Sequence, residues 1–403
     1  MTIFSTAQAV YAAQLDRSVL KDLWREKKSR QVIIQIVVII ILLSLLGFFV
    51  RNTLFNLGLL GRDVDYGFLF TPSNYDINQH LVDYTSRSTH LTATIVGIIN
   101  TGIVAICGIF LATVIGFVAG VARLSSNFLV SRIVYCFVEF SRNVPILLWI
   151  LLWHGVFIHS LPHPKQAVSI GEQIFLSNRG FYLPRPILEA EFWWVFIALA
   201  VAIVGAVIFI RFAKEKQELT GQRYPVYWIN TSLVILLPLI AFWIVGSPAS
   251  LEYAAFKGFN FTGGIVLTPE LVALTLALSV YTGAFIAEIV RSGILAVSHG
   301  QTEAAYALGL KPNWTMRLVI LPQALRVIVP PMISQYLNLT KNSSLAIAVG
   351  YMDIVATIGG ISLNQTGRAL ECMSIVLTIY LCLSLLISAF MNWYNKKISL
   401  VER

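Results

Sequence analysis

The amino-acid sequence predicts an all-α, polytopic membrane protein with about eight transmembrane helices, and two observations lead to this fold class. First, 57% of the 403 residues are hydrophobic, only 12% are charged and the mean hydropathy is +0.76, so a water-soluble fold could not bury its apolar surface. Second, apolar runs long enough to cross a hydrocarbon core of about 30 Å as helices recur along the chain. The sequence does not show the alternating segments of about ten residues that build a membrane barrel, so we expect the spans to be helices.

The apolar runs define the expected elements in order. Residues 1–31 are polar and charged, with no early apolar stretch and cleavage site, so we expect no removable signal peptide and assign insertion to the first span. As a helix, the run 91–122 would extend about 48 Å, so it must tilt or project from the bilayer. The run 325–361 is interrupted by prolines and glycines, which predicts a cytoplasmic helix that continues into a shorter span. The eight expected spans are residues 32–50, 91–122, 133–158, 192–212, 228–246, 268–290, 325–361 and 373–394.

The distribution of Lys and Arg predicts that both termini are cytoplasmic. Positive charge is retained on the cytoplasmic side of membrane helices. With the N-terminus inside, the inside segments hold more than twice as many Lys and Arg residues as the outside segments. The loop 291–322 and the C-terminal tail 395–403 are then cytoplasmic.

The loop 291–322 carries its own short helix. The pattern Ser298-His-Gly-Gln301 predicts a capping box, in which the serine oxygen accepts the N3 amide hydrogen and the glutamine side chain reaches back to the cap amide. Gly309 suits the left-handed position after the helix, and Pro312 forbids continuation. The helix is about ten residues and about 15 Å long, so it cannot span the bilayer.

One face of this short helix is formed by small residues. Ala304, Ala305 and Leu308 lie at helical spacing and let another surface approach closely, whereas Glu303 and Tyr306 point elsewhere. We therefore expect the helix to dock into a partner protein. The alternative is a helix on lipid headgroups, but such helices usually place bulky apolar residues opposite a Lys/Arg face.

The same loop carries a family motif. The loop resembles the signature loop of ABC importer permeases, with the same spacing throughout. That signature consists of EAA, three residues, Gly, nine residues, an aliphatic residue, any residue and Leu-Pro. Residues 287–310 (AEIVRSGILAVSHGQTEAAYALGL) and 140–149 (FSRNVPILLW) resemble polar amino acid permeases in particular. Residues 339–350 (LTKNSSLAIAVG) resemble that family's Lys-Asp-Thr-Ser-Leu segment, with Asn342 in the aspartate position.

The resemblance covers residues 90–394 and implies a type I ABC importer transmembrane domain with a core of five helices. The helix at 32–50 is then an N-terminal addition, and the two helices at 192–246 are an insertion between the second and third core helices. This layout is similar to the larger permease subunit of Gram-negative general L-amino acid transport systems, within the polar amino acid (histidine- and glutamine-type) family.

The resemblance also implies a function. The chain would be a non-catalytic permease subunit of the bacterial inner membrane that forms the path for L-amino acids, polar or of broad range. Its partners would be a dimer of ABC ATPase subunits, which bind ATP and Mg²⁺, a second homologous permease, a periplasmic amino-acid-binding protein and the bilayer, but no nucleic acid. This chain itself would bind no cofactor, and it contains no GxxxxGK[ST] phosphate loop. The implied ATPase-coupling residues are Glu303, Ala304, Ala305, Leu308, Gly309, Leu321 and Pro322.

Polar side chains inside the apolar spans are candidates for a substrate path or gate, because a charge at the bilayer centre costs at least about 2.5 kcal/mol. Glu139 and Arg142 either neutralise each other on one helix or line the path. The polar group at 341–344 either lines the path or forms hydrogen bonds between helices. Glu288 and Arg291 are expected to anchor the end of their span. The path candidates are Asn100, Glu139, Arg142, Lys341, Asn342, Ser343 and Ser344.

Two other classes of membrane protein fit the sequence poorly. A secondary transporter normally has coupling carboxylates at the midplane and inverted repeats, and the sequence suggests neither a deep acidic residue nor a repeat. A membrane enzyme needs a convergent set of catalytic groups, which the sequence does not offer. His154, His159 and His163 lack a carboxylate or cysteine at ligand spacing, and the four cysteines are scattered, so we expect no metal site and no disulfide.

Overall fold

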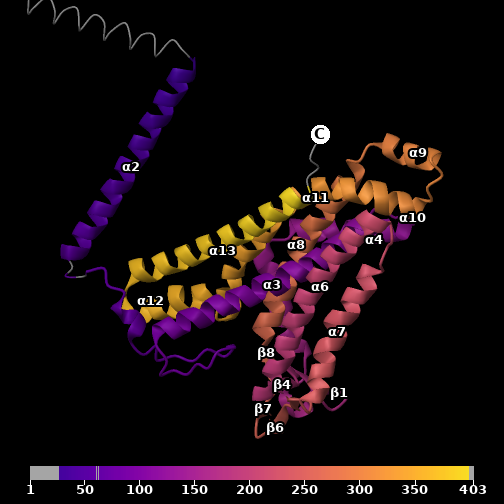
Figure 1. Cartoon of the computed structure of the whole chain (residues 1–403). Coiled ribbons are helices and arrows are strands. Elements are labelled where there is room, and N and C mark those ends of the chain that lie inside the picture. Colours follow the sequence, from indigo (N-terminus) through magenta and orange to yellow (C-terminus); the bar gives the residue numbers. More distant parts are fainter. Residues whose placement is uncertain (1–26, 60, 62, 399–403) are drawn as a thin grey trace, which may run out of the picture. The chain divides into compact units, whose positions relative to one another are not determined.

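The computed structural model describes residues 27–59, 61 and 63–398, which fall into two units, Met1–Tyr66 and Gly67–Arg403 (Figure 1). Residues 1–26 of the expected N-terminal segment and residues 399–403 of the expected tail lie outside the described residues. The first unit contains helix α2 (Lys27–Leu59), and all other elements belong to the second unit.

Helix α2 is apolar over most of its circumference. It has 33 residues, none of them buried, so it is longer than the predicted span 32–50. A helix that is hydrophobic on all sides requires an apolar environment such as a bilayer.

The central helices of the second unit are α3 (His90–Ala122) and α8 (Pro269–Leu295), which pack along each other. Gly116 and Gly120 of α3 provide the close approach, because a Cβ at Gly120 would lie 2.7 Å from the carbonyl oxygen of Ala287. The other helices of this core are α4 (Phe128–Asn143), α5 (Ile146–Ser160), α11 (Leu321–Asn342) and α13 (Ala369–Ile398).

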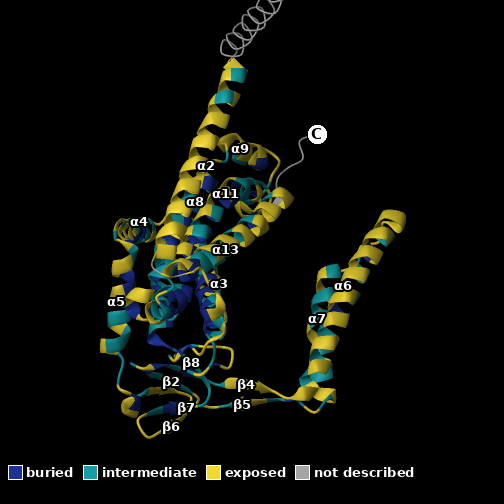
Figure 2. Cartoon of the chain, turned by 90° about the vertical axis from the view of Figure 1, so that its left-hand side faces the viewer, coloured by how far each residue is buried: buried dark blue, intermediate teal, exposed yellow. Residues whose placement is uncertain are grey.

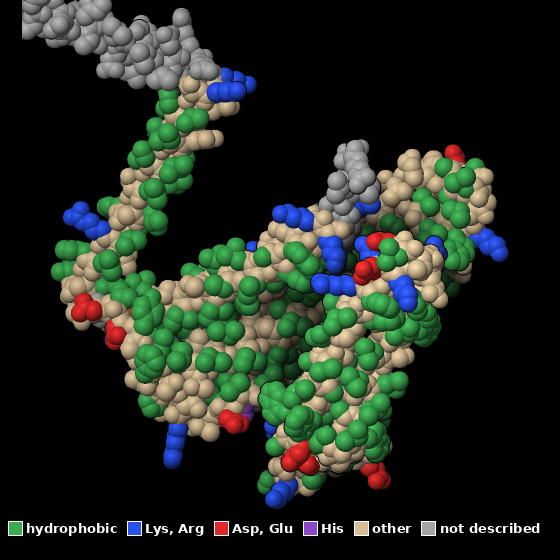
Figure 3. All heavy atoms as spheres, viewed as in Figure 1, with side chains coloured by type: hydrophobic (Ala, Val, Ile, Leu, Met, Phe, Trp, Pro, Cys, Tyr) green, Lys and Arg blue, Asp and Glu red, His purple; other side chains and the backbone are tan. Residues whose placement is uncertain are grey.

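The predicted fold class is confirmed. In the described part of the chain, seven helices are long and apolar enough to cross a membrane, or eight if the bent pair α4 and α5 counts as one span. Hydrophobic side chains cover the flanks of the second unit, and Lys and Arg side chains gather near the end that carries α4 and the C-terminal part of α13 (Figure 3).

The expected span 133–158 corresponds to two helices, α4 and α5, that are sharply bent against each other. The axes of α4 and α5 differ by 107° at a break between Asn143 and Ile146. Val144 is extended, with φ −89° and ψ 131°, because the ring of Pro145 disfavours helical geometry in the residue before it. Since Pro145 also lacks an amide hydrogen, α5 begins anew after it.

The expected break at Pro330 and Pro331 is wrong. Both prolines lie inside α11, which continues to Asn342. Membrane helices tolerate proline when neighbouring groups satisfy the freed carbonyls, and α11 packs against α3, α8 and α13.

The chain leaves regular helical geometry at Gly350, whose φ is +81°. Residues 351–353 then form a short non-helical connection to a second helical stretch that includes Gly359 and Gly360. The elements of this region are the 3-10 helix η5 (Ser343–Val349), the π-helix η6 (Val355–Ser362) and α12 (Leu363–Thr366).

Two further helices form a hairpin that corresponds to the expected insertion. The turn η3 (Ala190–Phe192) leads into α6 (Trp193–Thr220), and α7 (Val226–Ile244) returns along it. Small residues bring the two helices together, since a Cβ at Gly205 would lie 3.3 Å from Leu233.

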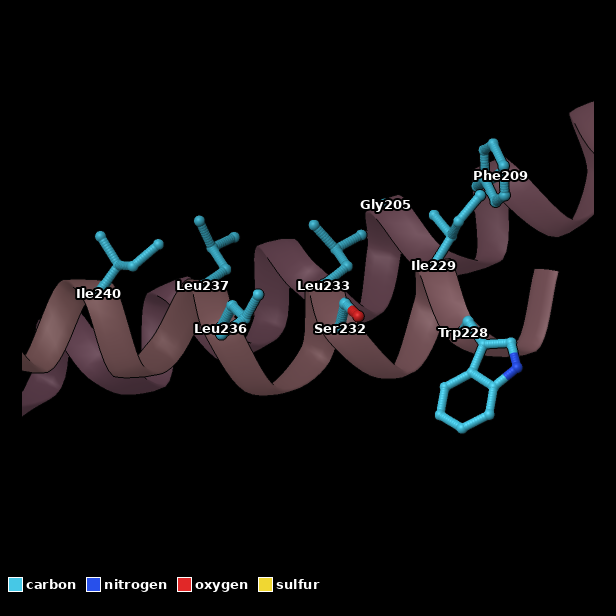
Figure 4. A pocket seen from close by; sticks show the side chains of 9 residues that line it. All are labelled: Gly205, Phe209, Trp228, Ile229, Ser232, Leu233, Leu236, Leu237 and Ile240. Atoms are coloured by element: carbon cyan, nitrogen blue, oxygen red, sulfur yellow. The ribbon is translucent and has the colours of Figure 1, made fainter. Parts of the chain in front are cut away.

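A groove of about 640 Å³ follows this hairpin (Figure 4). Leu233, Leu237 and Ile240 stand in a row along α7, and Phe209 comes from α6. None of the nine lining residues is charged, so the groove has no group that would pair with a charged ligand.

Short β-strands, which were not expected from the sequence, lie between α5 and α6 and between α7 and α8. The strands form a four-stranded sheet in the order β1-β2-β3-β8 and two antiparallel pairs, β4 with β5 and β6 with β7. Their bounds, with the turns η1 and η2, are η1 (Gly67–Phe70), η2 (Pro164–Gln166), β1 (Val168–Ile170), β2 (Ile174–Ser177), β3 (Gly180–Leu183), β4 (Arg185–Leu188), β5 (Ala249–Glu252), β6 (Ala255–Lys257), β7 (Asn260–Thr262) and β8 (Ile265–Leu267).

The strand region has its own small core. The rings of Phe175 and Tyr182 lie 4.6 and 4.7 Å from the ring of Phe261, measured between centroids. The Tyr182 hydroxyl donates to Asn260 Oδ1 at 2.7 Å. Burial raises the pKa of Tyr182, so this hydroxyl remains a donor.

Candidate functional site

The short helix expected in the loop 291–322 is α9 (His299–Ala307), and its end is as predicted. Gly309 has φ +77°. The amide of Gly309 donates to the carbonyl of Tyr306 at 2.9 Å, and the amide of Leu310 donates to the carbonyl of Ala305 at 3.1 Å. These two bonds form a Schellman motif, which satisfies the last carbonyls of the helix and fixes where it stops.

The start of α9 differs from the prediction. Ser298 occupies the N-cap position, but its side chain makes no capping hydrogen bond, so the capping box is not formed. The side chain of Gln301 instead accepts from Gln323 Nε2 of α11 at 3.1 Å. His299 Nδ1 lies 3.0 Å from Glu303 Oε1, one turn along the same face. Gln301 thus connects α9 to α11, whereas His299 and Glu303 pair with each other within α9.

The expected small-residue face of α9 is divided. Ala305 is 3% exposed and faces the protein, whereas Leu308 is 82% exposed. Ala304 and Glu303 are also exposed. Figure 2 shows α9 as a largely exposed helix with one buried point. One side of α9 is therefore attached to its own chain, and the other side is open to a partner.

The remaining motif residues lie at the start of α11. The helix α10 (Pro312–Thr315) and the π-helix η4 (Met316–Ile320) connect α9 to α11. Leu321 is half-buried, and Pro322 is exposed in the first turn. Ile320 and Leu321 both have right-handed helical geometry, so the helix continues from η4 into α11, and this proline lies directly after a π-helical segment, where a proline is accommodated.

An ionic cluster joins α3, α4 and α8. Arg142 Nη1 lies 3.7 Å from Glu139 Oε1, so the pair expected from the sequence is present. Arg123, at the end of α3, contacts the same Glu139 at 3.4 Å and also pairs with Glu288. Arg291 Nη2 donates to Glu288 Oε1 at 2.6 Å. Glu288 and Arg291 therefore anchor their span, as expected, and Arg123 extends the anchor to α3 and α4.

Asn100 lies in a buried polar node and not on an open surface. Its Nδ2 donates to the carbonyls of Gln79 and Met352, both at 2.8 Å. The adjacent Thr101 accepts from the amide of Ile354 at 3.1 Å. These bonds attach α3 to the non-helical connection after Gly350 and to the start of the next helical stretch.

The polar group at 341–344 is split between buried and open positions. Ser343 is buried and donates to the carbonyl of Thr340 at 2.8 Å. Ser344 donates to the carbonyl of Lys341 at 2.8 Å. Asn342 is half-buried, whereas the side chain of Lys341 is exposed.

A deep acidic residue is present, contrary to the sequence-based expectation. Asp353 is fully buried. Its Oδ1 accepts from the amide of Ala356 at 2.8 Å, and the hydroxyl of Tyr380 donates to Oδ2 at 3.2 Å. Asp353 is therefore the N-cap of the helical stretch that begins at Ile354, and it ties that stretch to α13. An aspartate three residues after Gly350 and just before an apolar run is the sequence signal that could have found it.

Among the described residues, no group of three or more His, Cys, Asp or Glu side chains is placed to hold a metal ion. His154 instead lies 4.0 Å from Glu270, between α5 and the first turn of α8.

Comparisons with known proteins find relatives that cover nearly the whole chain. The family model described as the binding-protein-dependent transport system inner membrane component matches residues 221–400. The chain is 46% identical over 378 residues to the general L-amino acid transport system permease protein AapQ of Rhizobium johnstonii, covering 94% of each chain.

Two further relatives have similar coverage. The putative amino-acid ABC transporter permease protein YhdX of Escherichia coli is 47% identical over 92% of this chain and 94% of its own. The glutamate/glutamine/aspartate/asparagine transport system permease protein BztB of Rhodobacter capsulatus is 45% identical over 94% of this chain and 96% of its own. Because so little of the chain is left uncovered, the relatives also share most of the segment between α5 and α8.

Proposed function

The chain belongs to the family of amino-acid ABC transporter permeases, and on this premise we propose that α9 couples its membrane helices to a separate ATP-hydrolysing subunit. The chain is the permease subunit of an amino-acid importer, and its own role in ATP hydrolysis is mechanical. Closure of two ATPases on bound ATP and Mg²⁺ would move the attached helices, and this movement would shift the permease pair between its two open states.

The observation that carries this proposal is the attachment of α9. Its buried side meets the chain through Ala305, and Gln301 connects it to Gln323 of α11. Its exposed side presents Glu303, Ala304 and Leu308. Because the Schellman motif fixes the end of α9 and Gln301 connects its first turn to Gln323, displacement of its open side would move α11.

The remaining partners complete the assembly. We propose that the chain assembles with a second, homologous permease and a periplasmic amino-acid-binding protein. We place it in the inner membrane, with both termini and α9 on the cytoplasmic side. The Lys and Arg side chains gathered near α4 and the end of α13 support this orientation (Figure 3).

The substrates we propose are L-amino acids, polar or of broad range. The names of the relatives support this class, since one describes a general L-amino acid system and another a system for glutamate, glutamine, aspartate and asparagine.

The coupling role is tested with charge reversal on α9. Glu303→Lys in the assembled complex should weaken ATPase association by about tenfold and reduce uptake of labelled L-glutamine with it. Gly309→Pro should have a similar effect, because proline cannot adopt φ +77° and lacks the amide that donates to Tyr306. Association is measured by co-purification and uptake in proteoliposomes.

The matched control is Glu218→Lys on α6. The side chains of Glu218 and Glu303 are 69% and 71% exposed, and each pairs with a residue one turn away. Glu218→Lys should leave association and uptake unchanged. Normal association and uptake in both α9 variants would exclude the coupling role.

A further inference from the structure

A small basic pocket lies where α3 and α8 end and α4 begins. Arg123 directly follows the last residue of α3, Arg291 lies near the C-terminal end of α8, and Arg132 belongs to the first half of α4. These three arginines are among its seven lining residues, none of which is acidic, and we call this site the arginine pocket. Its volume of about 220 Å³ is below the about 300–1,000 Å³ of pockets that enclose drug-sized ligands, so it suits a small anionic group.

The arginines at this end of the helices outnumber the carboxylates that pair with them. Glu288 pairs with Arg123 and Arg291. Glu139 pairs with Arg123 and Arg142. In these ion pairs two negative charges are shared by three positive ones, so the cluster keeps a positive charge in excess even before the third arginine of the pocket is counted.

Arg132 adds a further positive charge to the pocket. None of the described acids forms an ion pair with it. Its guanidinium lies 5.7 Å from the centre of the Tyr135 ring, and the guanidinium of Arg123 lies 4.8 Å from the same centre. Two like charges held around one ring repel each other, and a bound anion would offset that repulsion. A phosphate group fits this arrangement because guanidinium groups donate to it bidentately.

The arginine pocket lies at the membrane surface and not in the hydrocarbon core. Helix α3 has 33 residues and is about 50 Å long, so its ends project from a core of about 30 Å, and Arg123 follows its last residue. In its first two turns α4 exposes the apolar side chains of Phe128, Leu129 and Ile133, and Phe128 also lines the pocket. A soluble anion would leave this apolar surface uncovered, whereas the acyl chains of a lipid would cover it.

We propose that the arginine pocket binds the phosphate group of an anionic phospholipid such as phosphatidylglycerol. Arg132 and Arg291 donate to the phosphate oxygens, and Phe128 contacts an acyl chain. Basic pockets between membrane helices bind anionic headgroups in this way. Zwitterionic phosphatidylcholine binds more weakly, because the pocket repels its ammonium group. The bound lipid ties α4 to the last turns of α8, from which the loop 291–322 leaves.

The test uses the complete complex in detergent, with lipid binding followed by native mass spectrometry. The unmodified complex should bind phosphatidylglycerol about tenfold more tightly than phosphatidylcholine. Arg132→Met should weaken the binding of phosphatidylglycerol about tenfold and remove this preference. Arg132→Lys, which keeps the charge but not the bidentate geometry, should restore part of the affinity. Arg132 is chosen because no described acid pairs with it, so its loss leaves the ionic cluster intact.

The matched control is Lys397→Met at the end of α13. The ammonium of Lys397 lies 5.5 Å from the centre of the Trp393 ring, so this variant also removes an exposed cation from an aromatic ring. It should bind phosphatidylglycerol as the unmodified complex does. Equal losses in Lys397→Met and Arg132→Met would show that the lipid responds to net charge alone, and would overturn the proposal.

Unchanged binding of phosphatidylglycerol in Arg132→Met would overturn the proposal as well. So would binding of inorganic phosphate that depends on Arg132 without binding of the lipid, since the pocket would then hold a soluble anion. Loss of the ATPase or of the second permease from Arg132→Met would also overturn it, because Arg132 would then pair with an acid of a partner. The coupling role is tested separately, since Glu303→Lys is read by ATPase association and leaves the arginine pocket intact.

Discussion

At the scale of single residues, glycines set how closely α3 and α8 approach. A Cβ at Gly120 would lie 2.7 Å from the carbonyl oxygen of Ala287 and 2.7 Å from Cβ of Val290. Neither atom is the end of a flexible side chain, so the contact can be relieved only by moving the helices apart. Gly102, on the same helix, has no atom within 4 Å of its Cβ position.

We expect Gly120→Ala to lower the free energy of unfolding by about 1–3 kcal/mol, because it overpacks the contact between α3 and α8. Gly102→Ala is the matched control, and it should not destabilise the protein, since the space is open and alanine favours the helix. Thermal unfolding in one detergent, followed by tryptophan fluorescence, measures both. Equal midpoints for the two variants would contradict the packing argument.

At the scale of elements, the ionic cluster attaches α4 to the central helices. Arg123 is nearly buried and reaches carboxylates on two helices, Glu139 on α4 and Glu288 on α8. Its guanidinium also lies 4.8 Å from the centre of the Tyr135 ring. Arg132 lies 5.7 Å from that ring, and none of the described acids pairs with it.

We expect Arg123→Met to destabilise the protein by about 1–2 kcal/mol, a value reduced from that of a fully buried pair because the two glutamates are partly exposed. Arg132→Met removes a similar aromatic contact without an ion pair and should cost less. Thermal unfolding at low and high salt separates the two, since only the Arg123→Met deficit should shrink as salt screens the pair. A deficit independent of salt in Arg123→Met would argue for lost packing alone.

The elements also show what local sequence can predict. Hydropathy predicts the long helices because a span needs a continuous apolar run, and α3 matches its prediction within a residue. The effect of a proline on helix continuation cannot be read from the local sequence, since a helix stops before Pro145 but continues through Pro330. The groups that satisfy the carbonyls freed by a proline come from distant parts of the chain. Strands of three or four residues are too short for a period of two to be visible.

In the candidate site, features set by neighbouring residues could be predicted, and contacts between distant segments could not. The end of α9 follows from Gly309 and Pro312, which act within a few residues. Arg123 joins Glu139 and Glu288 across three separate segments, and no spacing in the sequence indicates that meeting. The face of α11 that stays open depends on which sides α3, α8 and α13 cover, so exposure of Lys341 could only be seen in the folded chain.

At the scale of the whole molecule, the second unit combines membrane helices with a strand region that has a separate core. Phe261 is 8% exposed and packs against Phe175 and Tyr182, whereas Phe259, two residues earlier, is 74% exposed. The strand region also contacts the helices, since the rings of Phe157 on α5 and Phe181 on β3 lie 5.5 Å apart, but the cluster around Phe261 is formed by its own residues.

We expect Phe261→Ala to destabilise the strand region by about 3–5 kcal/mol and to leave the helices folded. Limited proteolysis should then cut between residues 161 and 190 or 247 and 268 much faster than in the unmodified protein, with no change in helical circular dichroism. Phe259→Ala, which removes an exposed ring, should be cut at the unmodified rate. Equal cleavage of both variants would show that the ring cluster does not hold the region together.

The strands β4 and β5, which lead into and out of α6 and α7, are paired with Arg185 opposite Glu252 and Leu188 opposite Ala249. The Cα atoms of opposed residues in such a pair are about 4.5–5.5 Å apart, so the chain departs and returns at nearly one point. A two-residue turn from Leu188 to Ala249 would close the gap without moving anything else. The α6–α7 hairpin is thus a segment whose two ends meet, so its removal would leave the register of β4 and β5 without a long gap to bridge.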